Sequence, residues 1–384
     1  MTTKNKDFMR IAYVALAPFI SGSERSLQTI LSHCELVNIH PIVIAHLGSP
    51  LADWATKRGI ENYTCDLTVT GISQPLKWVR TNWQLFKILR RHKIQIIHSN
   101  QLWSYPAVAS IAKWMKLLRV CHFRDPVDRH CNWWLKSGLD LAVGISRYTT
   151  DQLVQSINPG LIGNIETIIN PVLMSSAIDS KEQARLTHCL KTKFGLRPGY
   201  FTFGFIGQIS EVKGLDLLLK ALSTLSHKRW QLLVAGDDPV EGKPYLKRCK
   251  LLVEKYGLSD NVIFSGFIEN TTEFYQVIDV VAMFSREEPL GRVPLEAGAS
   301  YRPSVATRVG GLPETIVDGK TGWLVDLEDT KAQARILENI MSLDLSVFGF
   351  QAREWVESVA NPEHYIIRLH KIYMHALENF NGKD

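Results

Sequence analysis

Apolar runs alternate with amphipathic stretches along most of the chain. Runs rich in apolar residues suit strands that are covered on both faces, as in a parallel sheet. They occur at residues 10–16, 41–45, near 63, and at 94–98, 120–123, 141–145, 201–207, 230–235, 261–267 and 281–284. This alternation of strands with helical patterns predicts α/β domains built on doubly wound parallel sheets.

The stretches between these runs have the spacing of helices with one apolar face. Helices are predicted at 24–31, 51–58, 78–91, 105–118, 147–156, 215–225, 329–342, 349–359 and 362–380. Glycine-rich segments at 309–314 and 318–325 predict turns. The length of 384 residues suggests two domains. The composition changes near Asn170-Pro171, and polar residues 176–199 predict a linker and a helix.

The overall composition is that of an ordinary globular protein, with 45% hydrophobic and 21% charged residues. No apolar run approaches the ~20 residues that a membrane-spanning helix needs. The first seven residues lack the apolar core of a signal peptide. Six cysteines are scattered without a C-x-x-C pair, which argues against a zinc site or a disulfide framework. We therefore expect a cytoplasmic protein.

The excess of basic over acidic residues lies in the first half of the chain. Residues 1–180 carry 19 Lys and Arg against 12 Asp and Glu, a net charge of +7, while the remainder is net −1. Seven of the ten tryptophans lie in the same half. A basic, tryptophan-rich surface can attract anionic lipid or a phosphorylated acceptor. No nucleic-acid motif accompanies it, so no nucleic-acid partner is expected.

Residues 77–91 form a basic amphipathic stretch with two interpretations. As a core helix with a solvated face, it would turn Trp78, Phe86 and Leu89 inward. Alternatively, it could touch a membrane surface and deliver a lipid-linked acceptor. In that case the protein would be peripheral on the inner face of the cell membrane.

Two acids lie eight positions apart, just after the strand run at 281–284. Glu288 falls on the loop after that strand, and Glu296 falls in the first turns of the next helix. Ligands of open α/β sheets bind at this edge. Carboxylates accept hydrogen bonds from sugar hydroxyls, and amides near Gly291 could hold a phosphate. The alternative is that both are solvated acids at a helix start.

Other polar residues fall at the same kind of strand end. Gly22 lies on the loop after the first strand, and Lys213 lies on the loop after the run at 201–207, where it could sit on a diphosphate or be merely solvated. In the first half, residues 98–100 and 122–125 put polar side chains at two strand ends. A single histidine at a strand end is more often structural, but two polar strand ends together favour a site.

These segments resemble the motifs of retaining, family 4 type glycosyltransferases with the GT-B fold (glycosyl transferases group 1). Residues 288–296 resemble the E-x7-E motif. Residues 207–214 resemble G-R-x(4)-K-G, with Lys213 matching and Gln208 in place of the arginine. Residues 21–25 resemble the glycine-rich first loop with one glycine lost, and Gly310-Gly311 also fits.

The resemblance implies two facing Rossmann-like domains with a C-terminal helix that crosses back. Residues 1–180, with 363–384 packing on them, would form the acceptor-side domain. Residues 181–362 would bind the nucleotide sugar. The reaction implied is transfer of a sugar, with retention, from a nucleotide diphosphate sugar (UDP- or GDP-sugar) to a hydroxyl acceptor in cell-surface polysaccharide, lipopolysaccharide or glycolipid synthesis.

The resemblance also assigns roles to residues. Glu288 and Lys213 would be catalytic. The donor would be bound by Gly22, Gln208, Lys213, Glu288, Gly291, Arg292 and Glu296. The acceptor side would include His122, Arg124 and Asp125. The family's strand-end position is occupied either by His122 or by Arg124-Asp125. No cofactor is implied, and no metal site, because the adjacent acids Asp237-Asp238 match a turn of the family instead.

Two alternatives remain open, and a third is disfavoured. The acceptor could be a soluble small molecule. The protein could be a catalytically silent partner that binds nucleotide sugars, which Gln208 and the reduced glycine loop favour. A nucleotide-dependent oxidoreductase would need a G-x-G-x-x-G turn after a strand, and neither set of strands is followed by one.

Overall fold

The computed structural model describes residues 8–67, 74–174, 180–226 and 229–382. The chain divides into two compact units. The first unit comprises residues up to Pro171 together with those from Pro362 onward, and the second comprises Val172–Asn361. The division therefore lies before the boundary expected at residue 180. Residues 175–179 of the expected linker lie outside the described part of the chain.

The first unit contains seven strands and the helices between them. In chain order these are β1 (Met9–Ala15), α1 (Gly22–Leu31), η1 (Cys34–Val37), β2 (Ile39–Ala45), α2 (Pro50–Lys57), β3 (Asn62–Thr64), α3 (Pro75–Arg91), β4 (Ile96–Ser99), η2 (Leu102–Ser104), α4 (Pro106–Trp114), β5 (Leu118–Phe123), α5 (Cys131–Trp134), β6 (Leu139–Gly144), α6 (Arg147–Ser156), β7 (Ile162–Thr167) and α15 (Pro362–Asn381).

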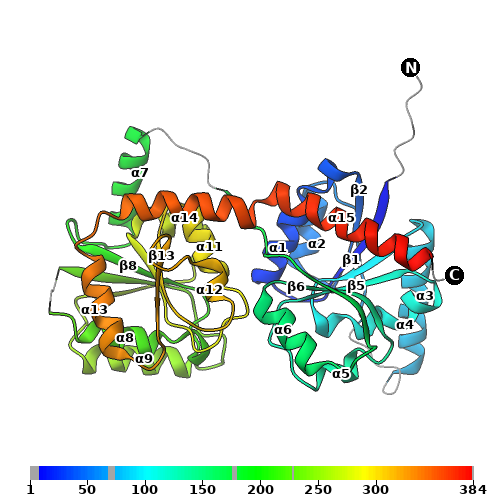
Figure 1. The fold of residues 1–384 in the computed structure, drawn as a ribbon, viewed down its shortest axis with the longest axis horizontal. Helices are drawn as coiled ribbons and strands as arrows, with labels where there is room; N and C mark the ends of the chain where they lie inside the picture. Colours follow the sequence, from blue (N-terminus) through cyan, green and yellow to red (C-terminus); the bar gives the residue numbers. More distant parts are fainter. Residues whose placement is uncertain (1–7, 68–73, 175–179, 227–228, 383–384) are drawn as a thin grey trace. The chain divides into compact units, whose positions relative to one another are not determined.

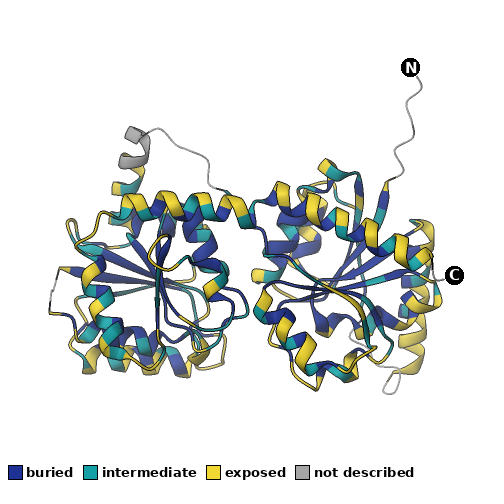
Figure 2. Cartoon of the chain, in the orientation of Figure 1, coloured by how far each residue is buried: buried dark blue, intermediate teal, exposed yellow. Residues whose placement is uncertain are grey.

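These strands form one parallel sheet in the order β3-β2-β1-β4-β5-β6-β7, with helices on both faces (Figure 1). Side chains of β1 alternate between the faces. Ile11 and Tyr13 pack with α1, α2 and α15, whereas Ala12 and Val14 pack with α3 and α4. The central strands β1, β4, β5 and β6 are largely buried, whereas residues of the edge strand β7 and the outer faces of the helices are exposed (Figure 2).

The second unit contains six strands. In chain order its elements are α7 (Ser180–Lys193), β8 (Phe201–Ile206), η3 (Glu211–Lys213), α8 (Leu215–Ser223), β9 (Trp230–Ala235), α9 (Pro244–Lys255), β10 (Val262–Gly266), α10 (Thr271–Val277), β11 (Val280–Met283), α11 (Arg292–Ala299), β12 (Ser304–Thr307), α12 (Leu312–Thr315), β13 (Gly322–Val325), α13 (Thr330–Ile340) and α14 (Leu345–Ala360).

The second sheet is also parallel, in the order β10-β9-β8-β11-β12-β13. Helices α8, α9 and α13 contribute to the core on one face, and α7, α10 and α11 contribute to the core on the other. Helix α14 lies close against α11, because a Cβ on Gly298 would meet Val356 Cγ2 at 2.7 Å. Both units are therefore Rossmann-like, and this part of the predicted fold is confirmed.

Some local predictions were wrong. Strand β7 was not predicted, because its exposed, polar residues lack the apolar run of a buried strand. The segment interpreted as a turn at 318–325 contains β13, a four-residue strand that begins at Gly322. The turn interpreted at 309–314 contains the start of the short helix α12. In α3, Trp78 does not turn inward, since 41% of it is exposed.

Candidate functional site

Loops that follow neighbouring strands of the second sheet are held together at its carboxyl edge. Gly214 ends η3 with φ +66°, and a Cβ there would lie 1.9 Å from the carbonyl oxygen of Phe284, just after β11. The backbone N–H of Arg286 donates to the Val212 carbonyl at 2.7 Å. The loop that carries Lys213 therefore rests against the loop that carries Glu288, and only glycine fits at the contact.

Lys213 and Glu288 form an ion pair across this contact. Lys213 Nζ lies 2.5 Å from Glu288 Oε2. The Glu288 residue is 7% exposed, while 26% of the Lys213 side chain is exposed. The two residues predicted to be catalytic thus lie together, although they are 75 positions apart in the sequence.

Glu296 and Arg292 form a second ion pair on the first turns of α11. Arg292 Nε donates to Glu296 Oε1 at 2.6 Å. Tyr275, on α10, donates its hydroxyl to Glu296 Oε2 at 3.0 Å. The helix begins at Arg292, three positions before the apolar pattern at Leu295. Sequence analysis did not identify Tyr275, because a single tyrosine inside a helix gives no signal of its partner.

Three glycines shape the loop between the two acids. Gly291 precedes α11 with φ +96°, and a Cβ there would meet Leu312 Cδ2 at 2.6 Å. Gly310, with φ +54°, and Gly311 pack directly against the backbone of residues 288–290, and the N–H of Gly311 donates to the Glu288 carbonyl at 2.8 Å. The first amides of a helix have no partner within the helix. The start of α11 can therefore donate to an anion beside both acids.

Gln208 is exposed on the loop after β8, next to the turn after β9. A Cβ on Gly236 would lie 1.8 Å from the Gly207 carbonyl oxygen, and the N–H of Ile209 donates to the Asp237 carbonyl at 2.9 Å. These two turns thus approach as closely as glycine allows. The side chain that replaces the family's arginine lies on the same sheet edge as Lys213.

The adjacent acids of the turn after β9 have structural partners. Asp237 Oδ2 pairs with Lys243 Nζ at 2.5 Å. Asp238 is buried and accepts from the N–H groups of Tyr245 and Leu246 at 2.9 and 3.2 Å, in the first turn of α9. Asp238 therefore anchors the start of a helix. In the described part of the chain, no group of three or more His, Cys, Asp or Glu residues is arranged to hold a metal ion.

A further ion pair supports the Lys213 loop and was missed by sequence analysis. Arg286 makes two hydrogen bonds of 2.9 Å to the carboxylate of Asp216 and a third of 2.6 Å to the Glu211 carbonyl. Burial alone would raise the pKa of Asp216, but its hydrogen bonds from Arg286 and Tyr245 prevail and hold that pKa below its usual range. Arg286 therefore fixes the position of the loop that presents Lys213.

In the first unit, Gly22 is exposed as the first residue of α1, directly after the N-cap Ser21. Glu24 lies fully buried beneath it. Its Oε2 accepts from the Ser21 N–H at 3.1 Å, and the Ser21 side chain accepts from the backbone at Glu24 in return, which forms a capping box; Oε2 also accepts from the Ser23 hydroxyl at 2.9 Å. The Ser-x-x-Glu spacing could have revealed this in the sequence. Glu24 thus holds the loop that brings Gly22 to the sheet edge.

The strand-end histidines of the first unit lie inside its core. His98 and His122 are each 1% exposed, and His98 Nε2 lies 2.6 Å from His122 Nδ1. His98 Nδ1 hydrogen-bonds Tyr373 OH, and His122 Nε2 hydrogen-bonds Tyr365 OH at 3.0 Å. Both tyrosines belong to α15. All four ring nitrogens are thus engaged within the unit, in a hydrogen-bonded row that we call the His–Tyr row.

The charge state of this row follows from its surroundings. Burial, aided by the positive charge of Arg124, lowers the pKa of His98 to about 3. Burial, together with Arg124 and His98, lowers the pKa of His122 well below its usual range. Both rings are therefore neutral near pH 7.

Arg124 is also engaged inside the first unit. Its guanidinium donates to the Asn100 carbonyl and side chain at 2.9 and 3.0 Å and to Asn170 Oδ1 at 2.6 Å. Asp125, the next residue, is exposed. Of the three residues predicted for the acceptor side, two are buried, and Asp125 alone is exposed. Their contact with an acceptor stays a prediction.

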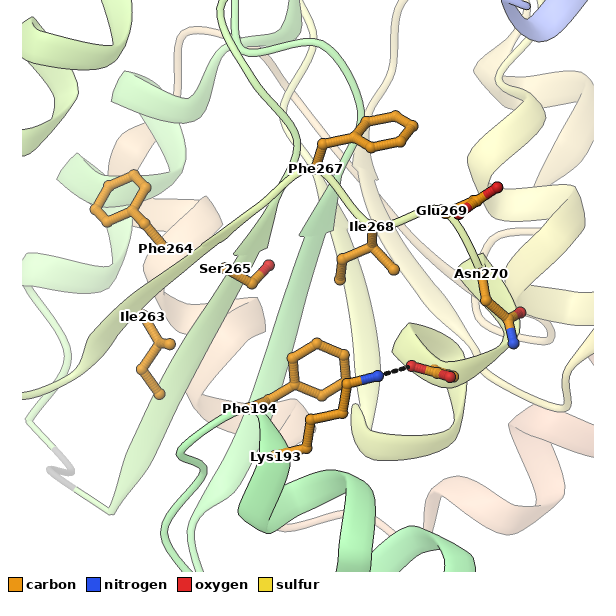
Figure 3. Close-up of a pocket in the computed structure, with 10 residues that line it drawn as sticks. Lys193, Phe194, Ile263, Phe264, Ser265, Phe267, Ile268, Glu269 and Asn270 are labelled. Atoms are coloured by element: carbon orange, nitrogen blue, oxygen red, sulfur yellow. Dashed lines mark hydrogen bonds and ion pairs between the residues drawn. The ribbon is translucent and has the colours of Figure 1, made fainter.

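A cavity of about 580 Å³ lies beside β10, the edge strand of the second sheet (Figure 3). It is lined by both apolar and polar side chains, and the ion pair between Lys193 and Glu273, 2.6 Å apart, crosses it next to Phe194. Its upper part is formed by Phe267, Ile268 and the following residues, which precede α10. Neither of the ion pairs at the start of α11 lines this cavity.

No helix in the described ranges is both long enough and apolar enough to cross a membrane.

Comparison with known proteins identifies the second unit. Residues 190–355 match the model of the family described as glycosyl transferases group 1. This segment contains Lys213, Glu288 and Glu296, so the predicted resemblance to glycosyl transferases group 1 is confirmed over these residues.

Curated relatives match mainly over part of their length. A D-inositol 3-phosphate glycosyltransferase of Corynebacterium urealyticum is 36% identical over 42% of this chain and 39% of its own length. An N-acetyl-alpha-D-glucosaminyl L-malate synthase of Bacillus anthracis is 25% identical over 78% of this chain and 80% of its own length. The chain thus spans well under two thirds of the Corynebacterium relative.

Among solved structures, Anabaena Alr3699/HepE in complex with UDP-glucose covers 96% of this chain with a TM-score of 0.82 at 18% sequence identity. That similarity shows the fold, which is GT-B.

Proposed function

We propose that this protein is a retaining glycosyltransferase that moves a sugar from a nucleotide diphosphate sugar to a hydroxyl acceptor. The observation that carries the proposal is the pairing of Lys213 with Glu288 beside the pairing of Arg292 with Glu296, all around the start of α11. The family match over residues 190–355 supports it independently. The complex of HepE with UDP-glucose favours a UDP-sugar as the first donor to test.

The two acids suit two different diols of such a donor. A carboxylate has about four lone-pair positions, so each can keep its cation and still accept from a hydroxyl. We propose that Glu296 binds the ribose hydroxyls and Glu288 binds hydroxyls of the transferred sugar. The base would lie near Phe267 and Ile268, at the rim of the cavity beside β10.

The cations suit the leaving group. When the bond between the sugar C1 and the diphosphate oxygen breaks, the diphosphate gains negative charge, the acceptor oxygen bonds to C1, and the hydroxyl proton passes to the departing diphosphate oxygen. Lys213, Arg292 and the amides at the start of α11 would stabilise that charge, with Gln208 donating a neutral hydrogen bond. Because Gln208 carries no charge, neutralisation relies more heavily on Lys213 than the family motif would suggest. Gly22, on the first unit, is a further proposed donor-binding residue.

The acceptor is assigned to the first unit, with His122, Arg124 and Asp125 as the proposed acceptor-side residues. A product in cell-surface polysaccharide, lipopolysaccharide or glycolipid synthesis fits the family. Exposed Asp125 is the residue of the three best suited to direct contact. A soluble small-molecule acceptor is the alternative.

A screen of UDP-, GDP- and ADP-sugars for thermal stabilisation, followed by an assay for release of the nucleoside diphosphate, tests the proposal. We expect one donor to raise the melting temperature and to be cleaved when acceptor is present, and Glu288→Ala to abolish the cleavage. Absence of stabilisation by every donor would contradict donor binding.

The second candidate is a catalytically silent protein that binds nucleotide sugars, and Gln208 is the observation that favours it. It predicts stabilisation by a donor without release of the diphosphate. Gln208→Arg adds the positive charge of the family motif. If the unmodified chain is silent, the change should create turnover only where the other catalytic groups are competent.

A further inference from the structure

A long segment of the first unit carries positive charge without any carboxylate. Between Asp66 and Asp125 the sequence has no Asp or Glu. The same segment contains ten Lys and Arg residues: Lys77, Arg80, Lys87, Arg90, Arg91, Lys93, Lys113, Lys116, Arg119 and Arg124. Arg124 is buried, and Arg119 pairs with Asp140 at 2.7 Å. Lys77 pairs with Asp66 at 2.6 Å. The other exposed members lie on α3, α4 and the turns that follow them, so their charge is directed toward the surroundings.

Helix α3 has an anchored end and an exposed end. Leu85, Ile88 and Leu89, near its C-terminus, are buried in the core of the first unit. In contrast, every residue from 74 to 80 is exposed, and Leu76 is 87% and Val79 57% exposed (Figure 2). The fold of this unit therefore leaves large apolar side chains of the first two turns in water, where they are unfavourable.

The exposed apolar side chains, together with the partly buried Phe86, form one stripe along α3. Residues 76, 79, 83 and 86 are spaced by three and four positions and so lie on one face of the helix. Trp83 stacks on Phe86 with ring centroids 5.3 Å apart, and Phe86 contacts Trp114 of α4 at 5.2 Å. Trp83 and Trp114 are 54% and 71% exposed. The stripe therefore continues onto the neighbouring helix.

Basic residues accompany the apolar stripe on the same face. The spacing is seven positions from Arg80 to Lys87 and three from Lys87 to Arg90, and all three residues are exposed. Lys87 Nζ lies 5.3 Å from the ring centroid of Trp83, and the Arg90 guanidinium lies 5.8 Å from that of Phe86. We call these side chains the aromatic–basic face; it comprises Leu76, Val79, Arg80, Trp83, Phe86, Lys87, Arg90 and Trp114.

We propose that the aromatic–basic face docks the protein on the surface of an anionic lipid bilayer. Such a surface offers negative headgroups for Arg80, Lys87 and Arg90, and apolar acyl chains directly beneath them for Leu76, Val79 and Trp83. Tryptophan favours this boundary, because its ring is apolar and its N–H is polar. A segment without carboxylates avoids repulsion from the headgroups. This docking does not depend on donor binding by the second unit, and it would bring the proposed acceptor side to lipid-linked molecules.

Co-sedimentation of the full chain with vesicles tests the proposal. We expect binding to vesicles of phosphatidylcholine with phosphatidylglycerol at low salt, release near ~0.5 M NaCl, and much weaker binding to phosphatidylcholine alone. Equal binding to both vesicle types, or no sedimentation with either, would overturn the proposal. A single-stranded oligonucleotide that binds tightly while the vesicles do not would assign the face to nucleic acid instead.

Charge variants locate the contact. Arg80→Gln, Lys87→Gln and Arg90→Gln together should weaken binding to the anionic vesicles by about fivefold for each residue changed. The control combines Lys320→Gln, Lys331→Gln and Lys371→Gln, three exposed lysines outside this face, and removes the same net charge. An equal loss in both triple variants would show attraction by net charge alone and would overturn this face as the contact.

A second pair of variants tests the apolar component. Leu76→Ser should weaken binding about tenfold, because its side chain would no longer enter the acyl region. Leu251→Ser, which changes a leucine that is 64% exposed on α9, should leave binding unchanged. Melting temperatures of all variants verify that each remains folded. Identical vesicle affinities for the two serine variants would contradict insertion of the α3 stripe.

Discussion

The polar strand ends of the two units have opposite environments. In the first unit, His98, His122 and Arg124 are buried, and their nitrogens are engaged by α15 and by nearby asparagines. In the second unit, Lys213, Arg292 and Glu296 keep part of their side chains exposed, and their partners are other ions. The same kind of position in the same kind of fold therefore serves cohesion in one unit and leaves charged side chains partly accessible in the other.

The difference lies in what a ligand could replace. An ion pair whose side chains are partly accessible can accept a sugar hydroxyl or donate to a phosphate while it keeps its partner, because a carboxylate has further lone pairs and an ammonium or guanidinium has further N–H donors. The buried His–Tyr row cannot do so without leaving donors or acceptors unsatisfied. Residue type and position at a strand end are therefore insufficient to identify a binding residue, and the partners decide.

The largest effect should come from Lys213→Ala in the second unit. Loss of the cation beside the leaving diphosphate should lower turnover by about 10²- to 10³-fold, the usual effect of removing one group that stabilises developing charge. Steady-state kinetics with the donor identified by the screen measures it. Lys243→Ala is the control, because Lys243 also pairs with an aspartate at 2.5 Å but is 51% exposed. If Lys213→Ala weakened binding of the bare nucleoside as much as that of the nucleotide, the lysine would be structural.

The second effect concerns His122→Ala in the first unit. The change leaves a cavity and deprives His98 and Tyr365 of a hydrogen bond, so the free energy of unfolding should fall by about 2–4 kcal/mol. Urea unfolding measures it, with His375→Ala on the exposed side of α15 as the control. Unchanged stability combined with a raised KM for the acceptor would instead support the acceptor-side role of His122.

Glu296→Gln should have a smaller effect, on donor affinity. If Glu296 holds the ribose, binding should weaken by about 1–3 kcal/mol, the range for hydrogen bonds to charged groups. Titration calorimetry measures the affinity. Glu357→Gln is a matched control, because Glu357 pairs with Arg353 in the same i, i+4 geometry, also at 2.6 Å, on α14. Equal donor affinity in both variants would remove Glu296 from the site.

The most gradual effect is a pH dependence of stability that originates in the first unit. The folded state holds His98 neutral down to a pKa of about 3, whereas the unfolded chain takes up a proton near its ordinary value of about 6.5. Stability should therefore fall as the pH falls from about 6.5 toward 3. The slope is about 1.4 kcal/mol per pH unit for each such histidine.

Unfolding free energies measured between about pH 7 and 5 test this dependence. His122 has its pKa shifted in the same direction, so His122→Asn should reduce the slope. A flat profile in the unmodified chain would show that the histidines are accessible to protons in the folded state.

The sequence predicted the fold well where a pattern repeats. Apolar runs located β1, β8 and β9, because buried parallel strands must be apolar on both faces. The edge strand β7 could not be found this way, since one side of it faces solvent and its residues are polar. Strand β13 was hidden by turn glycines, and Gly322 is needed there because a Cβ would lie 2.0 Å from the Ser304 carbonyl oxygen.

The candidate site was predictable only as a set of single residues. Motif spacing identified Lys213, Glu288 and Glu296, but their partners come from distant parts of the chain. Nothing in the sequence indicates that Tyr275 donates to Glu296 or that Arg286 holds Asp216. Asp238 replaces a glycine of the family motif. The reason for an aspartate at this position is seen only in its contacts with the start of α9. Such pairings depend on tertiary packing, which local patterns do not record.

Helix α15 sets the order in which the chain can fold during synthesis. It contributes Tyr365, Ile366, Leu369 and Tyr373 to the core of the first unit, whose other residues precede Val172. The ribosome therefore releases the whole second unit before the first can complete its core. Domains usually fold from the N-terminus onward, but here the later unit can finish first. Until then His98 and His122 lack their hydrogen-bond partners on α15. A nascent chain that stalls before residue 362 would carry a finished second unit and an open first one.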